Sequence, residues 1–111
     1  DVYKRQGEKI NAEEVETLLL RHPRVVDAAV VAMPDPRLGE RTCAYVVVRG
    51  APLDLAEVRE HFAALQVAKF KWPERLEHLE EMPRTLVGKL DKKRLRADIT
   101  GKLAVAPGGP A

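Results

Sequence analysis

The chain is organised around Pro83-Arg84-Thr85-Leu86-Val87-Gly88-Lys89-Leu90-Asp91-Lys92-Lys93. This stretch lies between a strand-like segment and a basic amphipathic helix, and it sets Lys89 directly behind Gly88. Because Gly88 has no Cβ, it can adopt backbone angles that are closed to other residues, so the loop can bend tightly. The pattern therefore favours a cation that is presented to an anionic ligand, either a phosphate or a carboxylate. The plainer interpretation is that Lys89 is one more solvated lysine on a surface turn.

A Walker-type phosphate loop is excluded by the residues around this lysine. That loop requires the pattern G-x-x-x-x-G-K-[ST]. Here Pro83 stands at the position of the first glycine, and Leu90 replaces the hydroxyl residue that would bind magnesium.

Length and composition indicate a single domain and constrain its partners. The 111 residues suffice for one domain that buries most of its unfolded surface. The 19 basic and 17 acidic residues nearly balance, so a nucleic-acid or membrane surface covering the whole domain is not expected. The single cysteine, Cys43, lies in an apolar run, which predicts a core thiol and fits a reducing compartment.

The sequence predicts neither a signal peptide nor a membrane-spanning segment. No apolar run approaches the ~18 residues that a membrane-spanning helix needs, and the first residues lack the apolar core of a signal peptide. We therefore expect a soluble, cytoplasmic domain.

The first third of the chain predicts a hairpin, then a helix. Val2–Lys4 and Glu8–Ile10 can pair around Gly7. Asn11 is a typical helix N-cap, and apolar residues at helical spacing follow until His22-Pro23.

The middle of the chain predicts two buried strands and a second helix. Val25–Met33 and Thr42–Val48 are short, valine-rich apolar runs, and residues 34–39 between them should break any regular element. Asp54, supported by Glu57, should cap a helix with one apolar face.

The last third predicts a strand, the lysine loop and a final helix. Arg75–Leu79 is the expected strand, and Asp91 can cap a helix whose apolar face carries Leu95, Ile99 and Leu103. Four basic residues of this helix should stay solvated: Lys92, Lys93, Arg94 and Arg96. Gly101 should fray its end.

The predicted order β-α-β-β-α-β-α, with an N-terminal hairpin, describes a small α+β domain in which helices pack on a small β-sheet. On its own, this order also fits a split βαβ module of the ferredoxin-like kind.

The run P-R-T-x-x-G-K-x-x-K resembles the C-terminal signature of the adenylate-forming enzymes, which include acyl-CoA synthetases, luciferases and peptide-synthetase adenylation domains. The resemblance implies that Lys89 is catalytic and bridges the substrate carboxylate and the α-phosphate of ATP, while Thr85 and Gly88 support its loop. A lysine suits this role because it is a compact charge on a flexible stem.

A second motif lies near the start of the chain. Arg5–Ile10 resembles the R-G-G-E-K-I loop that follows the domain hinge in these enzymes, although Gln6 stands where the family has glycine. The resemblance makes Asp1 the hinge residue, and it assigns Gly7, Glu8 and Lys9 to the loop used in the thioester-forming step. It divides the chain into a post-hinge hairpin loop (1–10), a mobile C-terminal domain (11–104) and a disordered tail (105–111).

The similarity runs over nearly the whole chain and favours one branch of the superfamily, the 2,3-dihydroxybenzoate-AMP ligases and their salicylate relatives. The matching segments are Gly7–Ile10, Leu18–Pro23, Gly39-Glu40, Cys43–Tyr45 and Phe70–Pro73. Such enzymes activate an aryl acid with ATP and Mg²⁺, rotate the C-terminal domain, and pass the aryl group to the phosphopantetheine of an aryl carrier protein in siderophore biosynthesis.

The resemblance also implies partners. The missing N-terminal domain would hold most of the ATP, Mg²⁺ and acid pockets, so we expect this chain alone to be inactive. His22, His61, His78 and Cys43 lack metal-ligand spacing, so no protein-held metal is expected.

Two alternatives stay open at this point. One is an acyl-CoA ligase for another carboxylic acid. The other is a stand-alone module that binds a small ligand or a nucleic acid, although the few aromatic residues do not alternate with basic ones as in single-strand binders.

Overall fold

The computed structural model describes residues 2–5, 8–35 and 39–104. The expectations for Asp1, Gln6, Gly7 and the tail after residue 104 therefore lie outside the described residues. The elements are β1 (Val2–Arg5), β2 (Glu8–Asn11), α1 (Ala12–Leu20), β3 (Val25–Asp35), β4 (Gly39–Val48), α2 (Leu55–Ala64), the 3₁₀ helix η1 (Lys69–Lys71), β5 (Arg75–His78) and α3 (Lys92–Ala104).

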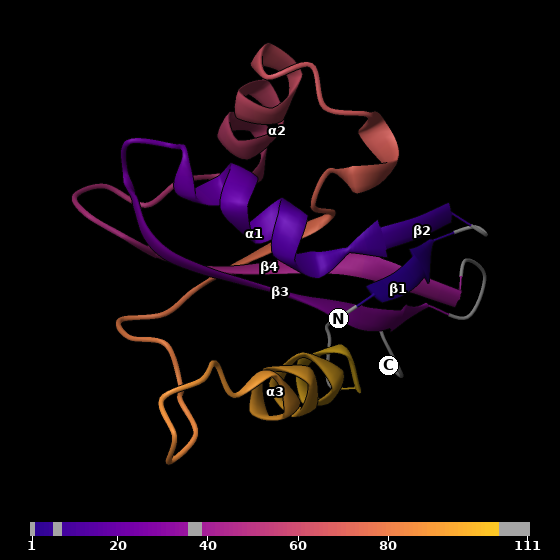
Figure 1. The fold of residues 1–111 in the computed structure, drawn as a ribbon, viewed down its shortest axis with the longest axis vertical. Helices are drawn as coiled ribbons and strands as arrows, with labels where there is room; N and C mark the ends of the chain where they lie inside the picture. The colour runs from indigo at the N-terminus through magenta and orange to yellow at the C-terminus, as the bar shows by residue number, and fades with distance from the viewer. Residues whose placement is uncertain (1, 6–7, 36–38, 105–111) are drawn as a thin grey trace.

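The predicted small α+β fold with an N-terminal hairpin is confirmed (Figure 1). β1 and β2 pair antiparallel in a sheet of their own. The second sheet has the order β3-β4-β5, with an antiparallel pair between β3 and β4 and a parallel pair between β4 and β5. Because the hairpin forms a separate sheet, the arrangement differs from the ferredoxin-like module, which joins its strands in one sheet.

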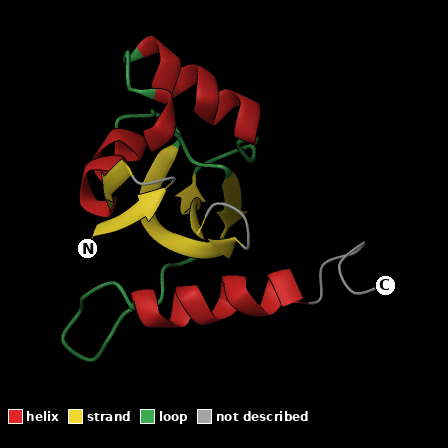
Figure 2. Ribbon diagram, turned by 90° about the vertical axis from the view of Figure 1, so that its right-hand side faces the viewer, coloured by secondary structure: helices red, strands yellow, loops and turns green. Residues whose placement is uncertain are grey.

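The central strand β4 is buried on both faces. Ala44 and Val46 point into one apolar cluster, and Cys43 and Tyr45 point into another, because successive side chains of a strand alternate between faces. The cluster around Ala44 and Val46, called the hairpin-side core, joins β1, β2, α1 and α2 to the sheet. The cluster around Cys43 and Tyr45, called the α3-side core, joins α3 to the opposite face. Figures 1 and 2 show the resulting layers, with α1 and α2 on one side of the sheet and α3 on the other.

The strands β3 and β4 are longer than predicted. Residues 34–39 were expected to break all regular structure, but pairing continues through Pro34 opposite Glu40 and Asp35 opposite Gly39. Proline is tolerated because β3 lies at the edge of the three-stranded sheet, where one row of N–H groups has no strand to bond.

The predicted caps of the helices are confirmed. The Asn11 side chain accepts hydrogen bonds from the backbone N–H groups of Glu13 and Glu14 at 2.9 and 3.4 Å. Asp54 and Glu57 form a reciprocal capping box at 2.7 and 3.1 Å. Each cap satisfies N–H groups that the first helical turn leaves unpaired.

One expectation about α3 is wrong. Lys92 is not solvated: its side chain is only 15% exposed and forms an ion pair with the carboxylate of Glu16. The reason is position, since Lys92 lies three residues before the buried Leu95 and shares its helical face. Gly101 lies within the last turn of the helix, which continues to Ala104.

A histidine pair joins the end of α1 to α2. The rings of His22 and His61 lie 5.1 Å apart, and His22 Nδ1 accepts a hydrogen bond from the Arg24 N–H at 3.1 Å. Burial, followed by the neighbouring His61 and Arg24, lowers the pKa of His22 below its ordinary value. The folded state therefore favours neutral His22.

This shift predicts a pH-dependent stability. Between the lowered folded pKa and about 6.5, the unfolded state binds more protons than the folded state, so stability falls as the pH drops through this window. Urea unfolding measures the free energy of unfolding at about pH 7.5 and about pH 5.5. Between these two pH values, His22→Gln should lose less of this free energy than the parent chain. His78→Gln is the control, because His78 is exposed in β5. An equal loss of stability in the parent chain and in His22→Gln would show that His22 is not the cause.

Candidate functional site

The loop that carries Lys89 is a closed turn with a defined shape. The Thr85 N–H donates to the Lys89 carbonyl at 2.8 Å, and the Gly88 N–H donates to the Thr85 carbonyl at 2.9 Å. Arg84 and Leu90 form an antiparallel bridge at its base. Gly88 has a φ of +86°, so the left-handed backbone expected of this glycine is present.

Apolar side chains anchor both ends of the loop. Met82 is buried in the α3-side core, and Leu90 packs against it. The Asp91 N–H donates to the Pro83 carbonyl at 2.9 Å. Leu86 and Val87 at the tip are instead 108% and 80% exposed, so the loop projects from the domain.

The Lys89 side chain is exposed and makes no hydrogen bond or ion pair within the described part of the chain. It borders an open hollow of about 510 Å³ that is also lined by Glu13, Glu16, Leu90, Lys92 and Arg96. The charge of Lys92 is offset by Glu16, whose carboxylate also accepts the Val30 N–H at 2.8 Å. Lys89 therefore keeps its positive charge available for an anion.

Helix α3 adds to the positive potential at this point. Lys89 lies three residues before Lys92, the first residue of α3. The N-terminal end of a helix carries a partial positive charge. Asp91 partly offsets it, since its side chain accepts the Arg94 N–H at 3.2 Å. Chemically, the arrangement suits contact with a carboxylate or a phosphate.

Arg84 connects the loop to the sheet, a role that the sequence did not assign. One guanidinium nitrogen donates to the Gly88 carbonyl at 3.2 Å, and the other donates to the Asp27 carboxylate at 2.7 Å. Arg84 lies inside the motif that identified the loop, but Asp27 is 57 positions away, so no local pattern could pair them.

The second predicted group lies on the hairpin. Glu8 and Lys9 are exposed in β2, opposite Arg5 and Lys4 in the register. The hairpin is fixed to the domain by the buried Tyr3, whose hydroxyl lies 2.6 Å from the Thr42 hydroxyl.

The structure does not bring the two groups together. In Figure 1, the strands β1 and β2 and the lysine loop lie on opposite sides of the domain. They also belong to different layers, because the hairpin packs in the hairpin-side core and the loop in the α3-side core.

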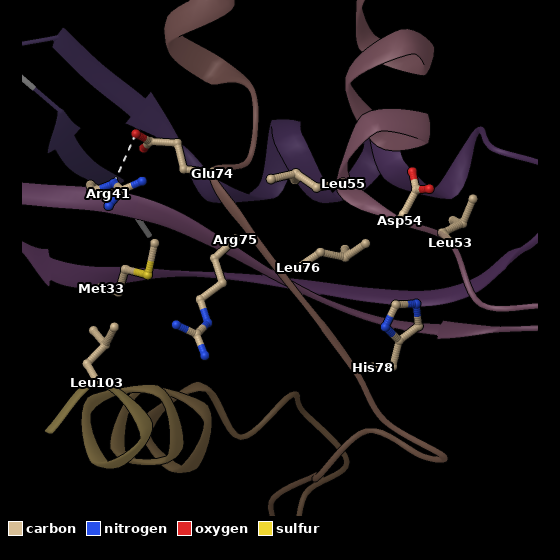
Figure 3. A pocket seen from close by; sticks show the side chains of 10 residues that line it. All are labelled: Met33, Arg41, Leu53, Asp54, Leu55, Glu74, Arg75, Leu76, His78 and Leu103. Carbon is tan, nitrogen blue, oxygen red and sulfur yellow. Dashed lines mark hydrogen bonds and ion pairs between the residues drawn. The ribbon is translucent and has the colours of Figure 1, made fainter. Parts of the chain in front are cut away.

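Another hollow, of about 380 Å³, lies along β5 (Figure 3). It contains none of the predicted site residues. Arg41 and Glu74 at its border form an ion pair at 3.1 Å, and Leu53, Leu76 and Leu103 contribute apolar surface.

The described part of the chain contains neither a metal site nor a membrane-spanning helix. Its histidine, cysteine, aspartate and glutamate side chains form no group of three that could hold a metal ion. None of its helices combines the length and apolar character needed to cross a bilayer.

Comparison with known proteins gives a consistent result. The sequence profile of the AMP-binding enzyme C-terminal domain matches residues 14–89. A salicylyl-CoA synthase / salicylate adenylyltransferase from a Streptomyces species is 54% identical over 103 residues, which are 92% of this chain and 19% of that protein. A medium-chain fatty-acid–CoA ligase from Escherichia coli is 51% identical over 106 residues, or 93% of this chain and 19% of that protein.

The fold is similar to solved structures as well. The apo structure of MbtA from Mycobacterium smegmatis superposes with a TM-score of 0.85 at 44% identity, covering 87% of this chain and 18% of that one. The chain thus spans about a fifth of the length of the proteins it matches.

The backbone of Gly88 gives a direct test of the loop geometry. A Cβ added at Gly88 or at Gly101 would meet nothing within 4 Å, so replacement by alanine tests the backbone alone. Gly88→Ala should lower the free energy of unfolding by about 1 to 2 kcal/mol, because φ is positive there. Gly101→Ala in α3 should raise it by about 1 kcal/mol, since alanine favours helix. Urea unfolding measures both, and a stabilising Gly88→Ala would contradict the left-handed turn.

Proposed function

The chain belongs to the AMP-binding enzyme C-terminal domain family, and on this premise we propose that it is the mobile domain of an ATP-dependent aryl-acid AMP ligase. The observation that carries the proposal is the ammonium of Lys89, which is exposed on a preformed loop and has no hydrogen-bond or ion-pair partner among the described residues. The similarity to a salicylate adenylyltransferase supports an aryl acid of the salicylate or 2,3-dihydroxybenzoate type as the substrate.

Lys89 would act in the first step. There, an oxygen of the acid carboxylate attacks the α-phosphate of ATP, the bond to the β-phosphate side breaks, and pyrophosphate leaves. The attacking and attacked groups are both anionic, so a cation between them lowers the repulsion and stabilises the charge that develops in the transition state. Thr85 and Gly88 would serve this step by closing the turn that presents the lysine.

The hairpin would act in the second step, in which a thiol sulfur attacks the carbonyl carbon of the adenylate and AMP leaves. We assign Gly7, Glu8 and Lys9 to the path of that thiol, and Asp1 to the hinge. The separation of the hairpin from the lysine loop supports this division, since one fixed orientation of the domain could not present both to one site (Figure 1).

The proposed partners follow from this chemistry. The thiol would be the phosphopantetheine of an aryl carrier protein, which places the ligase in siderophore biosynthesis. ATP and Mg²⁺ would be bound mainly by an N-terminal domain, because a lysine ammonium can contact a phosphate oxygen but has no lone pair for a metal ion.

A second candidate is a CoA ligase for an aliphatic acid, which the 51% identity to a fatty-acid–CoA ligase favours. Both candidates use the same first step and differ in acid and acceptor. Pyrophosphate exchange with the full-length ligase would separate them: exchange with salicylate or 2,3-dihydroxybenzoate supports the aryl-acid ligase, and exchange with octanoate alone supports the alternative.

The role of Lys89 predicts a step-specific defect. In the full-length ligase, Lys89→Ala should slow adenylate formation by about a hundredfold or more, since it removes a preorganised charge from the transition state. Transfer from supplied aryl-adenylate to the carrier thiol should change little.

The control is Lys93→Ala, which removes another exposed lysine four residues further on. Rapid-quench assays of both half-reactions give the answer. Equal losses in the two steps, or a similar loss in Lys93→Ala, would refute the proposed role of Lys89.

The hairpin loop predicts the opposite defect. Gly7→Leu in the full-length ligase should slow thioester formation while leaving adenylation unchanged, because a bulky side chain would narrow the path of the pantetheine arm. Gly7→Ala should give an intermediate effect. Stopped-flow transfer from preformed adenylate is the measurement, and an unchanged rate in Gly7→Leu would remove this loop from the thiol path.

A further inference from the structure

Within the described part of the chain, one side chain links the backbone of the lysine loop to the sheet, and that side chain is Arg84. Its guanidinium donates to the Gly88 carbonyl at 3.2 Å and to the Asp27 carboxylate at 2.7 Å. Gly88 directly precedes Lys89, so the contact lies one peptide unit from the reactive side chain.

A β-bulge in β3 places Asp27 where Arg84 can reach it. Residues two apart in a regular strand share a face, so Val25 and Asp27 would point to the same side. The register shifts between them, and Val25 packs in the hairpin-side core with Ala28. Asp27 is therefore turned to the α3 side, as bulges commonly re-aim one side chain.

A hydrogen bond to the backbone of β3 also orients the carboxylate of Asp27, one oxygen of which binds Arg84. Its other oxygen accepts the Ala28 N–H at 2.9 Å. Asp27 is thereby fixed to the sheet, and Arg84, which is bound to Asp27, holds the Gly88 carbonyl.

The link is poorly placed to stabilise the fold. The two side chains are 46% and 30% exposed, and ion pairs at such sites add little to global stability because water competes for both groups. The Arg84 contact instead restricts the orientation of a projecting loop whose tip, Leu86-Val87, packs on nothing in the described domain.

We infer that Arg84 and Asp27 are positioning residues for Lys89, and that they hold its loop in the shape needed for adenylation before the domain docks. The inference rests on the proposed function of Lys89. A small misplacement of a reactive group can cost as much as a hundredfold in rate, so a weak link can matter for the reaction without mattering for folding.

The first test uses the 111-residue chain and needs no activity. Order parameters from ¹⁵N relaxation should fall at Leu86, Val87, Gly88 and Lys89 in Arg84→Gln, from about 0.85 toward 0.6 or below. Arg94→Gln is the matched control, because it removes an arginine that lines the same surface hollow as Arg84. Unchanged order in the Arg84→Gln loop would overturn the inference.

The second test uses the full-length ligase and a double-mutant cycle. Arg84→Gln and Asp27→Asn should each lower kcat of adenylate formation by about tenfold or more, and the double variant should lose no more than the worse single variant. The KM for ATP and the rate of the thioester step should be unchanged, whereas a folding defect would alter both.

The outcomes separate this inference from the function it rests on. If Lys89→Ala abolishes adenylation while Arg84→Gln and Asp27→Asn match Arg94→Gln, the positioning role is refuted and the function of Lys89 stands. If the order parameters of the loop fall in Arg84→Gln but Lys89→Ala leaves adenylation intact, the proposed function of Lys89 is refuted. The role of Arg84 in ordering the loop is then still supported. Additive losses in the cycle would contradict a joint action of Arg84 and Asp27.

Discussion

The burial of β4 on both faces is the constraint on which the rest of the domain depends. Cys43, Ala44, Tyr45 and Val46 are each fully buried, so the strand needs a cover on both sides. The hairpin, α1 and α2 cover one face, and α3 covers the other. Burial also raises the pKa of the Cys43 thiol to about 12, which leaves it protonated and unreactive.

This layering assigns the hairpin strands and the lysine loop to different sides of the sheet. The hairpin is fixed in the first layer by Tyr3, and the lysine loop continues directly into α3 in the second. The layers meet around the edge strand β3, where Glu16 of α1 accepts the Val30 N–H and pairs with Lys92 of α3. A buried ion pair of this kind contributes little net stability but penalises other arrangements of α1 and α3.

The sequence predicted what depends on local patterns. Apolar periodicity located the helices and strands, and the caps at Asn11, Asp54 and Asp91 follow from side chains within three residues. The left-handed turn at Gly88 was expected for the same reason. The catalytic role of Lys89 came only from the resemblance and remains a proposal.

What the sequence could not predict depends on distant contacts. Arg84 and Asp27 are 57 residues apart, and the bulge that turns Asp27 leaves no mark in the apolar run of β3. The charge of Lys92 predicts solvent exposure, but this residue lies on the same helical face as the buried Leu95. Proline interrupts the pairing of central strands, but Pro34 lies in an edge strand, where pairing continues.

Distances in the full-length protein test most directly the proposal that one domain uses opposite sides in successive steps. Nitroxide labels at Val87→Cys or Glu8→Cys, each paired with a label on the N-terminal domain, can be measured by double electron–electron resonance. We expect the Val87 label to be the nearer one with ATP and acid bound, and the Glu8 label to be the nearer one with aryl-adenylate and a pantetheine thiol. If the same label is nearer in both states, the domain does not alternate and the claim is wrong.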